Sequence, residues 1–215
     1  MAQIIGIMGE SGAGKTTSLR NLDPKTTLYV DADKKGLSWK GWKKDYNAEN
    51  KNYFADDHAN VVKLALQKVN TDKEYKDYKV VVIDTLNGIM VADEMRRMKE
   101  KGFDKWQDLA ASVYDIIDYA LRMRDGVTVI FTAHTQTDHD DNGYMFTRIK
   151  TSGRKLDKIV LESKFPVVLH AKTIDGKHVF ETQADFSTAK TPLGAFEDKY
   201  IDNDIVEVLK VLEEY

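Results

Sequence analysis

The chain has no cysteine among its 215 residues and only three prolines. The absence of cysteine excludes a disulfide framework, a thiol nucleophile and a zinc site built on thiolates. Its apolar runs are shorter than the roughly 18 residues that a membrane-spanning helix needs. The first residues, 1–8, also lack the basic segment of a signal peptide. We therefore expect a cytoplasmic protein with no membrane contact.

The chain also lacks a strong charge of either sign. Lysine and arginine total 32, aspartate and glutamate total 35, and the formal net charge is −3. Any contact with nucleic acid must then come from a local basic patch, because the whole molecule does not attract a phosphate polymer. With 42% hydrophobic and 31% charged residues, the chain has the composition and length of one globular α/β domain, which we assign to residues 1–215.

Short apolar runs alternate with helical patterns over the first 135 residues. The runs 4–8, 27–30, 79–83 and 127–133 read as buried strands, and apolar residues recur at helical spacing between the last three. Such alternation predicts a three-layer fold with a mostly parallel central sheet and helices on both faces. Candidate helices cover about 62–69, 86–102 and 104–121, the last with the capping-box pair Asp104 and Gln107.

Two further elements are predicted late in the chain. Asp175-Gly176 lies between the apolar segments 166–171 and 178–182, which predicts an antiparallel hairpin with a tight turn. Residues 204–212 carry a helical pattern.

The clearest motif follows the first strand. Residues 9–16 fill every fixed position of the P-loop pattern, and a helix is expected directly after them. Glycines allow successive backbone N–H groups to face phosphate oxygens, where a Cβ atom would intrude. We expect Lys15 to reach the β- and γ-phosphates and the Thr16 hydroxyl to bind Mg²⁺. The predicted nucleotide-binding residues are Gly9, Glu10, Ser11, Gly12, Ala13, Gly14, Lys15, Thr16 and Thr17.

A carboxylate at the end of another buried strand suits the metal of such a site. Asp84 ends the strand 79–83, where it would hold Mg²⁺ through its water shell, or would act simply as a strand-end cap. Thr85 follows it, at the place where many P-loop motor ATPases carry a catalytic glutamate. The acid that activates water must then lie elsewhere.

These residues resemble the RecA-like recombinase core, and within it the small phage ATPases of RecA type associated with single-strand annealing. Four segments carry the resemblance: the phosphate loop 9–17, Val30 to Asp33, Val80 to Thr85, and Ile130 to His134. It implies a RecA-like P-loop NTPase fold, ATP and Mg²⁺ as ligands, and ATP hydrolysis linked to recombination, annealing or replication. A phage-encoded protein of this kind acts in the cytoplasm of a bacterial host.

The resemblance also implies roles for two further side chains. Asp33 matches the family's catalytic glutamate, although its side chain is shorter, so Asp31 remains an alternative base. His134 matches the amide that senses the γ-phosphate, while a purely structural histidine is the alternative. The expected catalytic set is Lys15, Asp33, Asp84 and His134.

The resemblance places a single-strand contact loop at residues 135–155. Aromatic and basic side chains there could stack bases and neutralise backbone charge: Tyr144, Phe146, Arg148 and Lys150. The acidic first half of the loop favours the alternative of a solvated flap. The lysine-rich segment 34–46, with Trp39 and Trp42, is a second candidate, unless its tryptophans pack on the domain.

RecA-like ATPases act as rings or filaments, so the resemblance implies a homo-oligomer. A cation from one subunit would complete the next subunit's site, and Arg154, Lys155 and Lys190 are candidates. Expected partners are single-stranded DNA and a single-strand-binding protein.

Two rival functions remain open. A small P-loop kinase would need a basic lid, for which the pairs Arg96-Arg97 and Arg122-Arg124 are available. A module in which ATP gates DNA binding, with negligible hydrolysis, would need no catalytic base. GTP is disfavoured, because residues 50–53 lack the acidic residue of the guanine-reading Asn-Lys-x-Asp motif.

Overall fold

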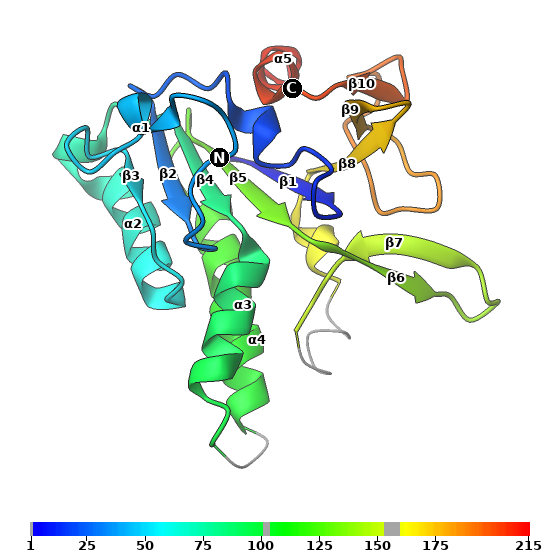
Figure 1. The fold of residues 1–215 in the computed structure, drawn as a ribbon, viewed down its shortest axis with the longest axis horizontal. Coiled ribbons are helices and arrows are strands. Elements are labelled where there is room, and N and C mark those ends of the chain that lie inside the picture. The colour runs from blue at the N-terminus through cyan, green and yellow to red at the C-terminus, as the bar shows by residue number, and fades with distance from the viewer. Residues whose placement is uncertain (1, 101–103, 153–159) are drawn as a thin grey trace.

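The computed structural model describes residues 2–100, 104–152 and 160–215. Its eight-stranded sheet has the order β10-β9-β8-β1-β5-β4-β2-β3, and the six strands from β8 to β3 run parallel (Figure 1). The strands are β1 Gln3–Gly9, β2 Thr27–Asp31, β3 Tyr53–Phe54, β4 Val80–Asp84, β5 Thr128–Ala133, β8 Val167–Ile174, β9 Lys177–Glu181 and β10 Tyr200–Asp202. The predicted α/β architecture is confirmed.

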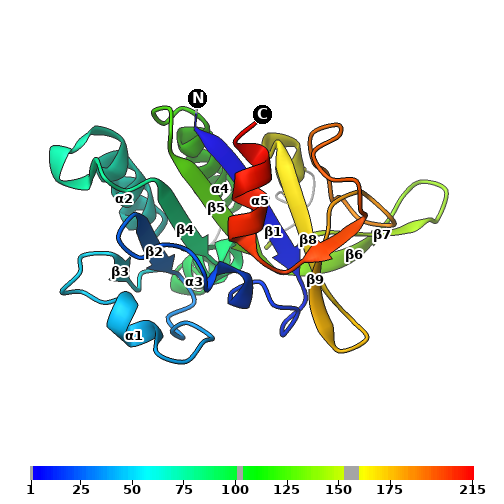
Figure 2. The same ribbon diagram turned by 90° about the horizontal axis from the view of Figure 1, so that it is seen from above.

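Helices cover both faces of this sheet. The helices α2 (Ala59–Thr71), α3 (Leu86–Arg96) and α4 (Asp104–Leu121) lie on one face, and α5 (Ile205–Leu212) lies across the other (Figures 1 and 2). Alternate residues of β1 serve the two faces: Ile4 belongs to the core beneath α2, α3 and α4, whereas Ile5 packs in the core beneath α5. This is the alternation that a strand buried on both sides requires.

Several predicted elements form as expected, and others differ. The turn at Asp175-Gly176 connects β8 to β9, and both residues have positive φ (49° and 75°), as the tight hairpin turn requires. The helix α3 ends at Arg96 rather than near residue 102. The side chains of the proposed capping box of α4, Asp104 and Gln107, lie outside the described part of the structure.

The predicted helix after the phosphate loop was wrong. Only one 3-10 turn forms, over Thr17–Leu19. Pro24 lies too near to permit a longer helix, since it lacks an N–H donor and disfavours helical backbone at Asp23. The Asp23 carboxylate instead accepts a hydrogen bond from the Lys25 N–H group at 3.0 Å and closes a turn into β2.

The predicted loop 135–155 contains a second, two-stranded sheet. β6 (Thr135–His139) and β7 (Met145–Ile149) form an antiparallel hairpin that extends outward from the main sheet in both views (Figures 1 and 2). The Asp140 carboxylate accepts hydrogen bonds from the N–H groups of Asn142 and Tyr144, both at 2.9 Å, and so holds the turn. One acidic residue of this segment therefore has a local structural role.

Candidate active site

The phosphate-loop segment leaves β1 at the carboxyl edge of the sheet, where ligands bind in folds of this type. Gly12 and Gly14 have φ values of +81° and +96°, which other residues rarely adopt. The Lys15 Nζ atom donates to the carbonyl oxygens of Gly9 and Glu10, each at 2.8 Å, so the lysine folds back across the loop. Burial lowers the pKa of Lys15, and the nearby charge of Asp84 opposes that shift.

The loop provides donors and is supported from behind. Within the described part of the chain, the N–H groups of Gly12, Gly14, Lys15 and Thr16 make no hydrogen bond to protein atoms. A Cβ atom on Gly14 would lie 2.9 Å from His178 and 3.0 Å from Asn203. These residues therefore pack against the loop, while its amides remain available to an anion.

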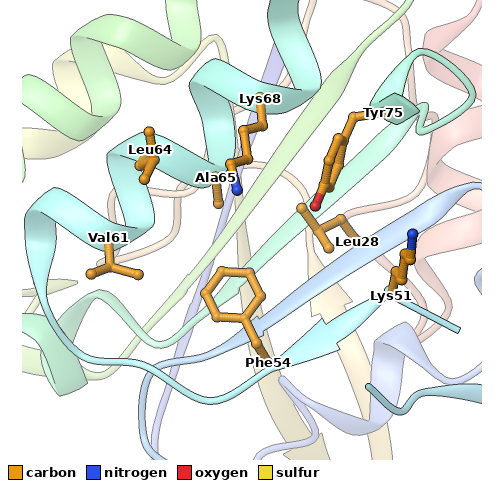
Figure 3. Close-up of a pocket in the computed structure, with 8 residues that line it drawn as sticks. All are labelled: Leu28, Lys51, Phe54, Val61, Leu64, Ala65, Lys68 and Tyr75. Atoms are coloured by element: carbon orange, nitrogen blue, oxygen red, sulfur yellow. The ribbon is translucent and has the colours of Figure 1, made fainter. Parts of the chain in front are cut away.

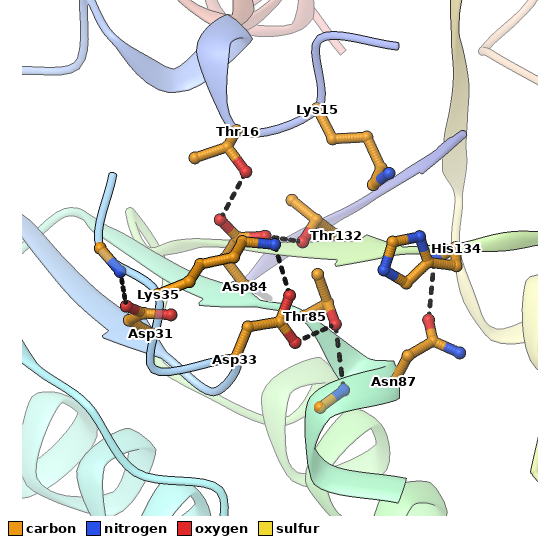
Figure 4. A network of polar contacts seen from close by, with 12 residues as sticks. Lys15, Thr16, Asp31, Asp33, Lys35, Asp84, Thr85, Asn87, Thr132 and His134 are labelled. Carbon is orange, nitrogen blue, oxygen red and sulfur yellow. Dashed lines mark hydrogen bonds and ion pairs between the residues drawn. The ribbon is translucent and has the colours of Figure 1, made fainter. Parts of the chain in front are cut away.

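Asp84 lies beside this loop as a buried carboxylate that accepts three hydroxyl groups. Thr16 donates at 2.8 Å and Tyr29 at 2.7 Å to Oδ2, and Thr132 donates to Oδ1 (Figure 4). β4, β2 and β5 are adjacent and parallel, which brings the three strand ends together. A hydroxyl and a carboxylate in direct contact are the donor set that Mg²⁺ prefers, so Thr16 and Asp84 fit the metal of a nucleotide site.

Asp33 lies near Asp84 and is held by two neighbours. The Thr85 hydroxyl donates to Asp33 Oδ1 at 2.9 Å, and the Lys35 ammonium lies 2.5 Å from Oδ2 (Figure 4). The Thr85 hydroxyl also accepts the Gly88 N–H at 3.0 Å, as the N-cap of α3. The residue after Asp84 thus positions Asp33.

The alternative base, Asp31, is committed to the structure. It is buried, and its Oδ2 accepts the Gly36 N–H at 2.7 Å and the Tyr53 hydroxyl at 2.8 Å. Burial, and then the hydrogen bond to Asp31, raise the pKa of Tyr53 and keep this phenol protonated. Of the two aspartates, Asp33 is the one whose carboxylate faces the Thr85 and Lys35 side of the site (Figure 4).

His134 follows β5 and connects the site to the hairpin. The backbone N–H of His134 donates to Asn87 Oδ1 at 2.7 Å. The side-chain amide of Asn87 donates to the backbone carbonyl of Lys150 at 2.9 Å. The Lys150 N–H donates in turn to the His134 carbonyl at 2.7 Å. Burial and the charge of Lys15 lower the pKa of the His134 imidazole, which favours its neutral form.

A second connection joins the phosphate loop directly to the hairpin. The Thr135 hydroxyl, at the start of β6, donates to a carboxylate oxygen of Glu10. Glu10 thus contributes its side chain to the hairpin base. The phosphate loop and the strand that follows His134 are coupled by a direct contact between side chains.

The four side chains predicted to contact DNA differ in exposure. Tyr144 is 67% exposed and Lys150 is also exposed, whereas Phe146 is half-buried. Arg148 is only 7% exposed and forms an ion pair with Asp138 at 3.2 Å. The Arg148 guanidinium therefore joins the two hairpin strands and is largely buried, and its contact with DNA stays a prediction.

The tryptophans of segment 34–46 pack on the domain. Trp39 lies 6.5 Å from Tyr29 and Trp42 lies 5.2 Å from Tyr53, centroid to centroid. The short helix α1 (Trp42–Asp45) belongs to this packing. The structure therefore favours the packing alternative over a stacking surface for DNA.

The arginine pairs proposed for a kinase lid are used elsewhere. Arg96 pairs with Asp57, and Arg97 pairs with Asp108 at 2.9 Å. Arg122 pairs with its own helix neighbour, and Arg124 donates to the carbonyl oxygens of residues 69, 76 and 78. All four arginines thus have partners on the helical side of the domain.

The proposed trans-acting cations divide into two groups. Arg154 and Lys155 lie outside the described residues. Lys190 is exposed to solvent, and its backbone pairs with Val168 of β8. Thr17, in the phosphate loop, contacts the Ser38 hydroxyl at 3.1 Å.

A separate cavity of about 220 Å³ lies between α2 and the β3 edge (Figure 3). Its lining is largely apolar, with Phe54, Val61 and Leu64 on view, and includes Lys51 and Lys68. Its lining residues include none from the phosphate loop and none of the side chains that contact Asp84. Among the described residues no helix is both long and apolar enough to span a membrane.

Several site residues escaped the sequence reasoning, among them Asn87 and Thr135, which connect the site to the hairpin. Tyr29 and Thr132 sit inside apolar strands, and only the register of β2, β4 and β5 shows that they meet Asp84. A polar residue at the end of such a run is a signal that could have found Thr132. Lys35 was counted with a basic surface segment, yet it contacts Asp33.

Comparison with known proteins identifies the family. A family model described as AAA domain, AAA_24, matches residues 1–192. No curated protein matches the chain. The match supports ATP binding by the phosphate loop. It gives no support to the narrower resemblance to phage recombinases. The chain belongs to the AAA_24 family and contains a P-loop ATP-binding domain of AAA type.

Proposed function

We propose that the protein is a Mg²⁺-dependent ATPase that acts on single-stranded DNA in recombination, annealing or replication. In this proposal the amides of the phosphate loop and Lys15 bind the phosphates, and Thr16 and Asp84 hold the metal ion. The bound Mg²⁺ would neutralise phosphate charge. Asp33 would accept the proton of the attacking water as the bond between the β-γ bridging oxygen and the γ-phosphorus breaks.

The observation that carries the DNA part is the double connection between site and hairpin. Glu10 contacts Thr135, and Asn87 joins His134 to Lys150. A change at the phosphate loop or at His134 would therefore move the hairpin base, and with it the exposed Tyr144. This coupling supports a hairpin whose contact with DNA depends on the nucleotide.

The test is the ATPase rate with and without a single-stranded oligonucleotide, with the mass of the protein measured in each nucleotide state. We expect stimulation by the oligonucleotide and assembly into a homo-oligomer, to which Lys190 would contribute. Equal rates in both conditions would contradict the DNA proposal. A phosphorylated small-molecule product would instead indicate a kinase.

The hairpin can be tested separately. Tyr144→Ala should weaken oligonucleotide binding by about 1–3 kcal/mol, the usual contribution of one stacked base. Lys150→Ala should lower the salt dependence by about 0.7 of a released counterion. Tyr215→Ala is the matched control, because Tyr215 is 62% exposed and lies at the chain's far end. Equal effects of the two tyrosine changes would contradict the hairpin assignment.

A second function is favoured by the state of Asp33. Its two carboxylate oxygens already have partners in Thr85 and Lys35, so a water molecule would have to compete with them for contact. An ATP-gated DNA-binding module with negligible hydrolysis fits that arrangement. ATP-dependent DNA binding without phosphate release would favour it over the ATPase.

A further inference from the structure

Lys35 extends from a loop that is fixed at several points. The loop 31–36 follows β2, and the Ala32 N–H donates to the Asp84 carbonyl at 2.7 Å. The Gly36 N–H donates to Asp31 at 2.7 Å, where Gly36 has a φ of +78°. These contacts hold the loop backbone against the strand that carries Asp84. The side chain of Lys35 is therefore presented to the site from a rigid base.

The Lys35 ammonium is paired with Asp33, and it can exchange this partner for another anion. The Lys35 side chain is 50% exposed, and its Nζ lies 2.5 Å from Asp33 Oδ2. The Asp33 side chain is only 16% exposed, so the ammonium is the better solvated partner and the one that can leave the pair at little cost. Lysine also has a long flexible stem, so its ammonium can move to another anion without movement of the backbone.

The other charges show where that anion would be. Figure 4 shows the Lys15 and Lys35 ammonium groups and the His134 imidazole pointing toward one region of the site, next to Asp33 and Asp84. Burial alone would lower the pKa of Lys35 itself, but the hydrogen bond and charge of Asp33 raise it. The raised pKa favours the charged form of Lys35, which lies at the same site as Lys15 (Figure 4).

The neighbouring lysine has a different environment. Lys34 has a φ of 57° and pairs with Asp57 at 2.8 Å, beside Arg96. Asp57 follows β3 and is separate from the Asp33–Asp84 group. One loop thus carries two adjacent lysines, of which only Lys35 contacts a carboxylate of the site.

We propose that Lys35 is a cis-acting γ-phosphate-binding residue that distinguishes ATP from ADP. On binding of a triphosphate, the ammonium leaves Asp33 for a γ-phosphate oxygen, and the Asp33 oxygen that it releases becomes available to water. A diphosphate offers no oxygen at this position, so Lys35 stays on Asp33. This inference rests on the nucleotide binding proposed above and assigns to the same chain a role usually sought in a neighbouring subunit.

The test measures dissociation constants for Mg·ADP and for the Mg²⁺ complex of the β,γ-imido analogue of ATP by calorimetry. Lys35→Met should weaken binding of the analogue about fivefold, equal to about 1 kcal/mol. Its affinity for ADP should stay within about twofold, which also shows that the variant is folded. Lys35→Arg should keep the preference for the triphosphate, and Lys34→Met is the matched control.

The outcomes separate this inference from the proposed function. If the parent protein binds neither nucleotide, both fail. If the parent binds both and Lys35→Met retains the full preference for the triphosphate, only the role of Lys35 is overturned. Equal weakening for both nucleotides overturns it as well, because that result indicates general phosphate attraction. Loss of preference in Lys34→Met would also contradict the assignment.

Discussion

The phenol of Tyr29 offers a quantitative test of how Asp84 is held. Tyr29 is buried, and its hydroxyl donates to Asp84 Oδ2 at 2.7 Å. Burial, followed by the charge of Asp84, raises the pKa of Tyr29 well above its ordinary value, so the phenol keeps its proton and donates at every pH of interest. Tyr29→Phe removes this donor and creates almost no cavity.

The expected cost follows from the kind of hydrogen bond that is lost. A bond to a charged acceptor contributes about 1.5–3 kcal/mol to stability. In a chain of this size, that loss corresponds to about 3–12 °C in the unfolding midpoint. The free energy of unfolding should be measured in urea, where an unchanged slope shows that the denatured state is unaffected.

Tyr46 provides the control from the same aromatic cluster. Its ring lies 5.7 Å from that of Tyr29, but its hydroxyl donates to the neutral Leu22 carbonyl at a long 3.4 Å. Tyr46→Phe should therefore cost about 0.5–1 kcal/mol or less. If Tyr29→Phe costs no more than Tyr46→Phe, Asp84 is not a carboxylate stabilised by hydroxyl donors, and its assignment as a prepared metal ligand loses its basis.

Three further predictions concern the same edge of the sheet. Asp33→Asn should leave the dissociation constant for ATP nearly unchanged and slow phosphate release at least tenfold; undiminished turnover would place the base elsewhere. Gly88→Ala should destabilise the fold by about 1–3 kcal/mol in urea, because a Cβ there would lie 2.5 Å from Asp33 Oδ1 and 2.7 Å from the Ala32 carbonyl; unchanged stability would refute this packing. Burial, and then the charge of Lys15, lower the pKa of His134 in the folded state, so its contribution to stability is complete above the unfolded value of 6.5 and declines as the pH falls below it. The His134→Gln variant should accordingly lose less stability than the parent between pH 7.5 and 5.5, and parallel curves would contradict that assignment.

Local sequence signals predicted the parts of the site that lie in one segment. The phosphate loop needs particular residue types at consecutive positions, so its pattern can be recognised from the sequence alone. Asp84 was predicted because it ends an apolar run that can only be a buried strand. The pair Asp175-Gly176 likewise predicted the hairpin turn, because these residue types tolerate the positive φ values that the turn requires.

Features that depend on contacts between distant segments were not predicted. The hydroxyls of Tyr29 and Thr132 meet at Asp84 only because β2 and β5 flank β4 in register. The pairing of Asp138 with Arg148 depends on the hairpin register, which the polar sequence of that segment does not specify. The helix expected after Lys15 failed because Pro24 limits its length.

The measurement that tests nucleotide binding at the phosphate loop most directly is the Mg·ATP affinity of Lys15→Ala against that of the parent. The Lys15 ammonium lies among the loop carbonyls of Gly9 and Glu10, so its removal deletes the principal cation there without disturbing the sheet. We expect at least a tenfold loss of affinity, equal to about 1.4 kcal/mol, while Lys34→Ala binds as the parent does. A Lys15→Ala protein that binds Mg·ATP as tightly as the parent would contradict the account.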